Sequence, residues 1–143
     1  MFNNERIVLQ VNNYDHVDGK FAYSKKDKKI LVGCEENEIM LKIMEEGKEI
    51  ELPLHRVLDL ALVASKSLVY FQEAYRHPKL YDPNNPIIGK IGLQGSSMTL
   101  EVCMENEGID QDIDQLSRQI NKQGELIGER IRMISEELEE LGY

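Results

Sequence analysis

The sequence predicts an α+β protein, built from an antiparallel sheet of five or six strands with one long helix and C-terminal helices packed on one face. Two stretches alternate apolar and polar residues around tight-turn sequences, a pattern typical of β-hairpins. Other stretches repeat apolar residues every three or four positions, which is typical of amphipathic helices. At 143 residues, we expect the chain to form a single domain over residues 1–143.

The first alternating stretch predicts three antiparallel strands joined by two short turns. The turns fall at Glu36-Asn37 and Glu46-Gly47. Because the loop of a tight hairpin fixes its register, Ile43 should lie opposite Ile30 on one side and Ile50 on the other. These pairs share one apolar face, so the sequence predicts a meander with one side towards a core.

The second alternating stretch predicts a separate hairpin later in the chain. A turn at Gly95-Ser96 suits a type II′ turn, which has glycine in its first central position. This turn pairs Ile91 with Leu100 on the apolar face and Lys90 with Glu101 on the polar face. Gly89 falls within a strand, where it predicts a bulge or a close backbone approach.

Between the hairpins, apolar residues at helical spacing predict one long helix. The helix should start with Pro53, which is tolerated in a first turn, and end before Pro78, so it should occupy residues 53–77. The C-terminal segment holds two amphipathic runs separated by Gly124, which predicts two helices, with one kinked helix as the alternative.

The composition restricts the class of partner. A net charge of -9 disfavours binding to nucleic acid and to anionic lipid. The sequence shows neither a signal-peptide pattern nor an uninterrupted apolar stretch of membrane-spanning length. Cys34 and Cys103 fit no disulfide framework or zinc spacing, and are expected to be reduced, buried thiols. We therefore expect a cytoplasmic protein without a nucleic-acid or membrane partner.

No cofactor, metal site or catalytic residue is predicted. The three histidines, His16, His55 and His77, lack the close spacing of a zinc motif. His55 and Asp59 lie one helical turn apart, as in half of a general-base pair, but no nucleophile is placed to complete it. These residue types are therefore read as surface side chains.

Two further motifs resemble ion or phosphate sites only in part. The acidic run at 110–114 begins like a calcium loop but lacks its glycine and its final glutamate, and suits a helix N-terminus better. Gly89, Gly92 and Gly95 have the spacing of a phosphate cradle but lie along a hairpin rather than ahead of a helix.

The end of the long helix and the following loop supply a candidate ligand site. Tyr70, Glu73, His77 and Tyr81 bring aromatic and ionisable side chains together there. Most of this composition is also explained by helix packing, helix termination and a turn. The alternative function is therefore a small-molecule-binding protein or enzyme that uses residues 70–81.

A candidate interface lies on the second face of the predicted sheet. Leu31, Met40, Met44 and Ile88 should point away from the helices, among lysine and glutamate side chains. Such a face needs partial cover, either by the N-terminal segment around residues 7–11 or by a second subunit. The leading hypothesis is accordingly a small, acidic, non-enzymatic interaction protein that forms a homodimer.

The phrases LPLHRVLDLA, IGLQG and GELIGER resemble those of a small uncharacterised bacterial protein family. The resemblance covers about the C-terminal two thirds of the chain. It implies a single domain and carries no assigned activity.

Overall fold

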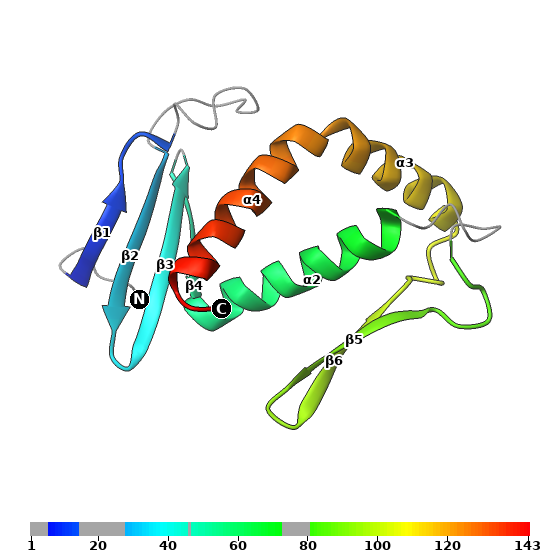
Figure 1. The fold of residues 1–143 in the computed structure, drawn as a ribbon, viewed down its shortest axis with the longest axis horizontal. Coiled ribbons are helices and arrows are strands. Elements are labelled where there is room, and N and C mark those ends of the chain that lie inside the picture. The colour runs from blue at the N-terminus through cyan, green and yellow to red at the C-terminus, as the bar shows by residue number, and fades with distance from the viewer. Residues whose placement is uncertain (1–5, 15–27, 46, 73–80) are drawn as a thin grey trace. The chain divides into compact units, whose positions relative to one another are not determined.

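The computed structural model describes residues 6–14, 28–45, 47–72 and 81–143, and Figure 1 shows its fold. Six strands and three helices form within these ranges, which confirms the α+β class. The chain divides into two compact units, Met1–Ala61 and Leu62–Tyr143. The single domain over residues 1–143 stays a prediction.

The first unit contains a four-stranded antiparallel sheet whose strands follow chain order. They are β1 (Ile7–Val11), β2 (Lys29–Glu35), β3 (Glu38–Glu45) and β4 (Lys48–Pro53). Ile43 lies opposite Ile30 in β2 and Ile50 in β4, as predicted. The register follows from the sequence because each connection is short enough to leave a single pairing.

Strand β1 shows where residues 7–11 of the N-terminal segment lie. It pairs antiparallel with β2, and its register shifts between Ile7 and Leu9. The segment therefore extends the sheet as an edge strand. It does not cover the sheet's second face, which was one of the two covers expected from the sequence.

The second unit contains a separate two-stranded sheet, made of β5 (Ile87–Leu93) and β6 (Ser96–Glu101). The six strands thus divide into sheets of four and two strands, where the sequence predicts one sheet. Alternation of apolar and polar residues identifies each hairpin, but it is the same whether two hairpins share a sheet or not.

The turn of the second hairpin lies one residue earlier than predicted. Its central residues are Gln94 and Gly95, with φ angles of 53° and 81°, and Ser96 begins the next strand. Two consecutive positive φ angles define a type I′ turn, in which glycine favours the second central position. The predicted Gly95-Ser96 turn is therefore wrong.

The shifted turn also changes the cross-strand partners. Ile91 lies opposite Met98, and Lys90 lies opposite Thr99, so the predicted cross-strand pair of Lys90 with Glu101 is wrong. From Gly89 to Ile91 each cross-strand partner moves by two positions, which leaves these side chains on their predicted faces. The predicted irregularity at Gly89 is confirmed, because the register shifts between Ile87 and Gly89.

Three helices complete the described structure: α2 (Leu54–Gln72), α3 (Ile109–Lys122) and α4 (Gly124–Glu140). The predicted break near Gly124 is confirmed as two helices, with Gln123 between them. The predicted continuation of α2 to residue 77 lies outside the described residues. From Leu62 onward, α2 belongs to the second unit.

The core of the second unit joins α2 and α3 to the hairpin region. Tyr81, Val102 and Ile113 are buried there, and four partly buried side chains pack around them: Tyr70, Phe71, Ile88 and Ile109. Beyond the bulge, the amide of Val102 donates a 2.8 Å hydrogen bond to the carbonyl of Pro86, which holds the chain after β6 beside the approach to β5. This cluster positions the candidate site.

Candidate functional site

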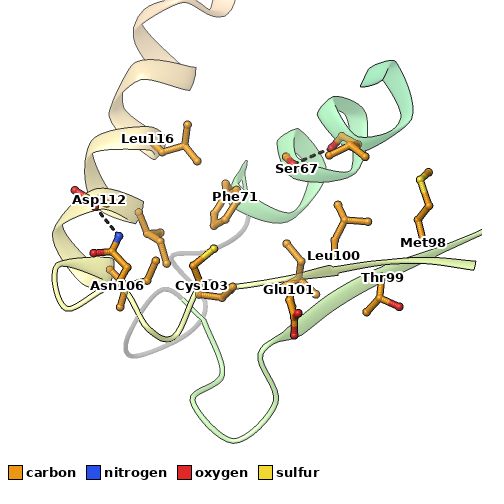
Figure 2. A pocket seen from close by; sticks show the side chains of 15 residues that line it. Ser67, Phe71, Met98, Thr99, Leu100, Glu101, Cys103, Asn106, Asp112 and Leu116 are labelled. Atoms are coloured by element: carbon orange, nitrogen blue, oxygen red, sulfur yellow. Dashed lines mark hydrogen bonds between the residues drawn. The ribbon is translucent and has the colours of Figure 1, made fainter. Parts of the chain in front are cut away.

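A groove of about 530 Å³ lies within the second unit, as Figure 2 shows. Its fifteen lining residues come from α2, β5, β6, the segment after β6, and α3. Most of the lining is apolar. The groove adjoins the core, because Phe71, Val102 and Ile113 belong to both.

One wall of the groove is a single face of α2. Val63, Ser67 and Phe71 are four residues apart, so they lie above one another along the helix. The hydroxyl of Ser67 donates a 2.8 Å hydrogen bond to the carbonyl of Val63, one turn earlier. Its donor is thereby used within the helix, and the wall offers mainly apolar surface.

The opposite wall is a face of α3. Ile109, Asp112, Ile113 and Leu116 recur at spacings of three and four residues, which places them together on the helix. Ile113 is buried, whereas Leu116 retains 43% of its exposure. Leu116 therefore offers apolar surface that the protein itself leaves uncovered.

Strand β6 lies between the walls. Its side chains alternate, so that Met98 and Leu100 point towards α2 while Thr99 and Glu101 point to the other side in Figure 2. Leu100 and Met98 are half-buried. They extend the apolar surface from the core along the hairpin.

Two hydrogen bonds fix the loop at the α3 end of the groove. The side-chain amide of Asn106 donates to Oδ2 of Asp112 at 2.8 Å, as drawn in Figure 2. The backbone N–H of Gly108 donates to Oδ1 of Asn106 at 2.9 Å. Asn106 thus ties the entry of α3 to its first turn, and holds Asp112 at the edge of the groove.

The charges of the lining are one-sided. Glu101 and Asp112 are acidic, and none of the fifteen lining residues, all in the described part of the chain, is Lys, Arg or His. Apolar surface bordered by carboxylates suits a ligand that combines an apolar face with positive charge.

Of the four residues in the predicted ligand cluster, Tyr70 and Tyr81 belong to the core of the second unit, and the other two lie outside the described residues. Tyr81 is buried in the core, and the rings of Tyr70 and Phe71 meet edge to face with centroids 5.1 Å apart. Neither tyrosine lines the groove. Glu73 and His77 lie outside the described residues, so ligand binding by these four residues stays a prediction.

The surroundings of Tyr70 shift its ionisation. Burial raises the pKa of Tyr70, a hydrogen bond with the backbone of Asp82 lowers it, and the negative charge of Asp82 raises it, with a net upward shift. Tyr70 therefore stays neutral to a higher pH than an exposed tyrosine. Its neutral ring packs against Phe71, which lines the groove.

The predicted interface residues lie in different environments. Leu31 is only 3% exposed, whereas Met40, Met44 and Ile88 are half-buried. Ile88 is the member of this set that lines the groove. Their role in an interface stays a prediction.

Sequence reasoning did not find the groove, although it named some of its residues. Phe71 and Leu116 belong to the apolar repeats that predicted the long helix and the first C-terminal helix. Periodicity shows which helix face is apolar, but not which part of that face remains uncovered after folding. The apolar repeats were the only feature of the sequence that pointed to the groove, and they do not show how the helices pack against each other.

The other candidate motifs show no grouped chemistry. Asp110 and Asp112 lie in the first turn of α3, where their charges oppose the helix dipole. His55 is exposed, while His16 and His77 fall outside the described ranges. Across residues 6–14, 28–45, 47–72 and 81–143, no three His, Cys, Asp or Glu side chains group so that they could hold a metal ion.

Among the described residues, no helix combines the length and the apolar character that crossing a bilayer requires.

Comparison with known proteins identifies a family. The model of a family of unknown function, DUF6530, matches residues 2–143, and the chain belongs to this family. No curated protein and no solved structure matches the chain significantly.

Proposed function

We propose that this member of the DUF6530 family is a non-enzymatic interaction protein that binds a basic amphipathic helix of a protein partner in the groove of its second unit. The observation that carries the proposal is the groove itself, with about 530 Å³ between apolar side chains of α2, β6 and α3. The carboxylate of Asp112 at the edge of the groove supplies the preference for positive charge, and Glu101, whose side chain points away from α2, adds negative charge nearby.

The volume of the groove suits the apolar side chains of a ligand. Binding sites in proteins commonly enclose about 300–1,000 Å³ and are lined mainly by apolar groups. Burying one leucine-sized side chain contributes about 1.5–3 kcal/mol. Two or three such side chains from a partner could therefore carry most of the binding free energy.

The shape of the lining favours a helix over an extended peptide. Two walls are helix faces, α2 and α3, and neighbouring helices pack about 8–10 Å apart through side chains at spacings of three and four. A helix that enters a groove presents anchors at the same spacings. An added strand would instead bind the backbone of a sheet edge, whereas the lining consists of side chains from helix faces as well as from β6.

The overall charge supports the preference for a basic partner. The chain carries a net charge of -9, which attracts a positively charged segment at long range and accelerates encounter. Near the groove, Asp110 and Asp112 in the first turn of α3 add local negative charge. Salt should therefore weaken binding through the association rate.

A small apolar molecule is the second candidate ligand. The same volume fits one, and Tyr70 packs against Phe71 of the groove wall, which connects the groove to the predicted cluster at residues 70–81. Retention of a fixed extra mass in a native mass spectrum of the purified protein would favour this candidate over a helical partner.

The proposal also includes a bacterial protein that acts in the cytoplasm as a homodimer. Cys34 and Cys103 are both free, a state suited to a reducing compartment, and both are exposed, so the burial predicted for them from the sequence is wrong. The homodimer is supported by exposed apolar surface outside the groove, on α4.

The test uses a fluorescent model peptide of about 14 residues with leucine at helical spacing and lysine elsewhere, long enough to form a helix on binding. Its affinity would be measured by fluorescence anisotropy for the wild type, Leu116→Glu and Leu93→Glu. The two leucines are matched, with exposures of 43% and 39%, but only Leu116 lines the groove.

Both substitutions add one negative charge, so attraction by charge alone would strengthen binding to either variant. Binding in the groove predicts that Leu116→Glu weakens affinity by about tenfold or more, while Leu93→Glu does not. A peptide with glutamate in place of lysine should bind more weakly than the basic peptide. Equal affinities for the wild type and Leu116→Glu would refute the proposed site.

A further inference from the structure

Helix α4 carries an exposed apolar stripe that is separate from the groove. None of its residues is buried, and its apolar side chains include Ile131 at 48%, Ile134 at 56%, Leu138 at 45% and Leu141 at 70% exposure. None of these four lines the groove. Such a stripe marks an interaction surface, because a helix of a globular protein ordinarily buries its apolar face.

The spacing of the stripe is that of a coiled coil. Ile127, Ile131, Ile134, Leu138 and Leu141 are separated by four, three, four and three residues. This repeat places Ile131 and Leu138 at a positions and the other three at d positions of a heptad. A partner helix could therefore interlock with the stripe along most of α4.

The charges of α4 are unevenly distributed along the helix. Arg130 and Arg132 share its N-terminal half with Glu125 and Glu129, while the C-terminal half holds four glutamates and no basic residue: Glu136, Glu137, Glu139 and Glu140. In the heptad above, Arg130 and Glu137 both occupy g positions. Among the e and g positions, which border the stripe directly, these two residues are the charged ones, and their charges are opposite.

We infer that α4 is a self-association helix that pairs antiparallel with α4 of a second copy of this chain. The inference rests on the homodimer included in the proposed function, and it names the surface and the orientation of that dimer. The occupant is a second copy because Arg130 of one helix meets Glu137 of the other only when the two helices run in opposite directions.

The charges select one register as well as one direction. When Ile131 packs against Ile134 of the second copy, Arg130 comes beside Glu137 of that copy, and two-fold symmetry produces the pair twice. A shift by one heptad brings Glu137 beside its own copy, which is repulsive. In a parallel pair, Arg130 and Glu137 would face Ser135 and Gly142, and no charge pair would form.

The first experiment measures the dimer dissociation constant by sedimentation equilibrium up to about 100 µM chain. The variants are Ile134→Glu and Met133→Glu, adjacent residues with exposures of 56% and 59%. Ile134 is on the stripe and Met133 is beside it. We expect Ile134→Glu to raise the dissociation constant by about 100-fold or more, and Met133→Glu by less than about threefold.

The second experiment determines direction by charge exchange. Arg130→Glu and Glu137→Arg should each weaken the dimer by about five- to tenfold, because each creates two like-charge contacts. The double variant restores opposite charges in both pairs of an antiparallel dimer, so its dissociation constant should return to near the wild-type value. Circular dichroism of each variant verifies that the helices are retained.

The outcomes separate this inference from the proposed function. A wild type that stays monomeric up to about 100 µM overturns both the homodimer and the pairing of α4. A dimer that Ile134→Glu leaves intact keeps the homodimer but overturns the α4 surface. Failure of the charge exchange to restore dimerisation overturns the antiparallel orientation. None of these results depends on peptide binding to the groove.

Discussion

The side-chain amide of Asn106 donates a 2.8 Å hydrogen bond to the carboxylate of Asp112 across the loop that connects β6 to α3. Asn106 also accepts a hydrogen bond from the backbone N–H of Gly108, at 2.9 Å. Both Asn106 and Asp112 line the groove. Asn106 therefore stabilises the loop before α3 and holds the carboxylate of Asp112 at the edge of the groove.

Replacing Asn106 by alanine should lower the free energy of unfolding by about 1–2 kcal/mol, because two hydrogen bonds at a helix entry are lost. Urea denaturation would measure the change. Asn121→Ala, at an exposed position on α3, is the matched control and should alter stability by less than about 0.5 kcal/mol. Equal stabilities of the two variants would show that the Asn106 hydrogen bonds contribute nothing.

The type I′ turn of the second hairpin predicts that substitution by alanine destabilises the protein more at Gly95 than at Gly92. Gly95 has a φ of 81°, so Gly95→Ala should destabilise the protein by about 1 kcal/mol even though no atom lies within 4 Å of the added Cβ. Gly92→Ala should be neutral or slightly stabilising, since its Cβ would meet only the carbonyl of Ser96 at 3.8 Å. Thermal unfolding of both variants provides the comparison, and similar losses at the two sites would contradict the type I′ turn.

The raised pKa of Tyr70 predicts a loss of stability in alkali. Burial is the main cause of the shift from the ordinary value of 10.0. The folded protein holds the phenol proton more tightly than the unfolded chain, so this contribution is present below about pH 10 and is lost as the pH rises through the folded pKa. Tyr70→Phe should therefore lose less stability than the wild type as the pH rises above about 10.

Tyr143→Phe is the control for this measurement, because Tyr143 is 91% exposed. Its stability should follow the wild-type pH profile in urea denaturation. If Tyr70→Phe also follows that profile, burial of the Tyr70 hydroxyl does not contribute to the alkaline loss.

A buried lysine in the first unit predicts a further effect. Lys42 is 5% exposed, and its Nζ lies 2.9 Å from Oε2 of Glu49 and 4.0 Å from Oε1 of Glu51. Lys42→Met keeps much of the apolar stem but removes the cation between two carboxylates, so stability should fall by about 1–3 kcal/mol. Lys48→Met, at an exposed position on the same sheet, should change it by less than about 0.5 kcal/mol. A more stable Lys42→Met variant would show that burial of this charge is a net cost.

The first sheet could be predicted from the sequence because local chemistry decides it. The pairing of Ile43 with Ile30 and Ile50 follows from short connections and alternation alone. The second hairpin was predicted with its turn one residue late, because Gly95 can serve as the first residue of a type II′ turn or the second of a type I′ turn. The positive φ angle of Gln94 shows that the turn is of type I′. Glutamine rarely adopts a positive φ angle, so the residue type gave no indication of this turn.

The candidate site could be predicted only in part. The amphipathic faces that hold Phe71 and Leu116 were visible as repeats, but their uncovered portions depend on how α2, β6 and α3 meet in space. The buried environment of Tyr81 was equally hidden, since a loop residue beside prolines gives no periodic signal of burial. Tertiary packing supplies what neither composition nor spacing contains.

The groove also contains a natural reporter of occupancy. Cys103 lines it, while Cys34 lies on β2 in the first unit, and both thiols are exposed. Alkylation of the two thiols by iodoacetamide, followed by mass spectrometry with and without the basic helical peptide, measures both sites in one molecule. Cys34 is thus an internal control for Cys103.

This alkylation experiment tests the proposed groove most directly. Binding of the peptide in the groove predicts that alkylation of Cys103 slows by about tenfold at saturating peptide, while the rate at Cys34 stays unchanged. An unchanged rate at Cys103 under conditions where anisotropy shows the peptide bound would contradict the account, because the helix would then occupy a different surface.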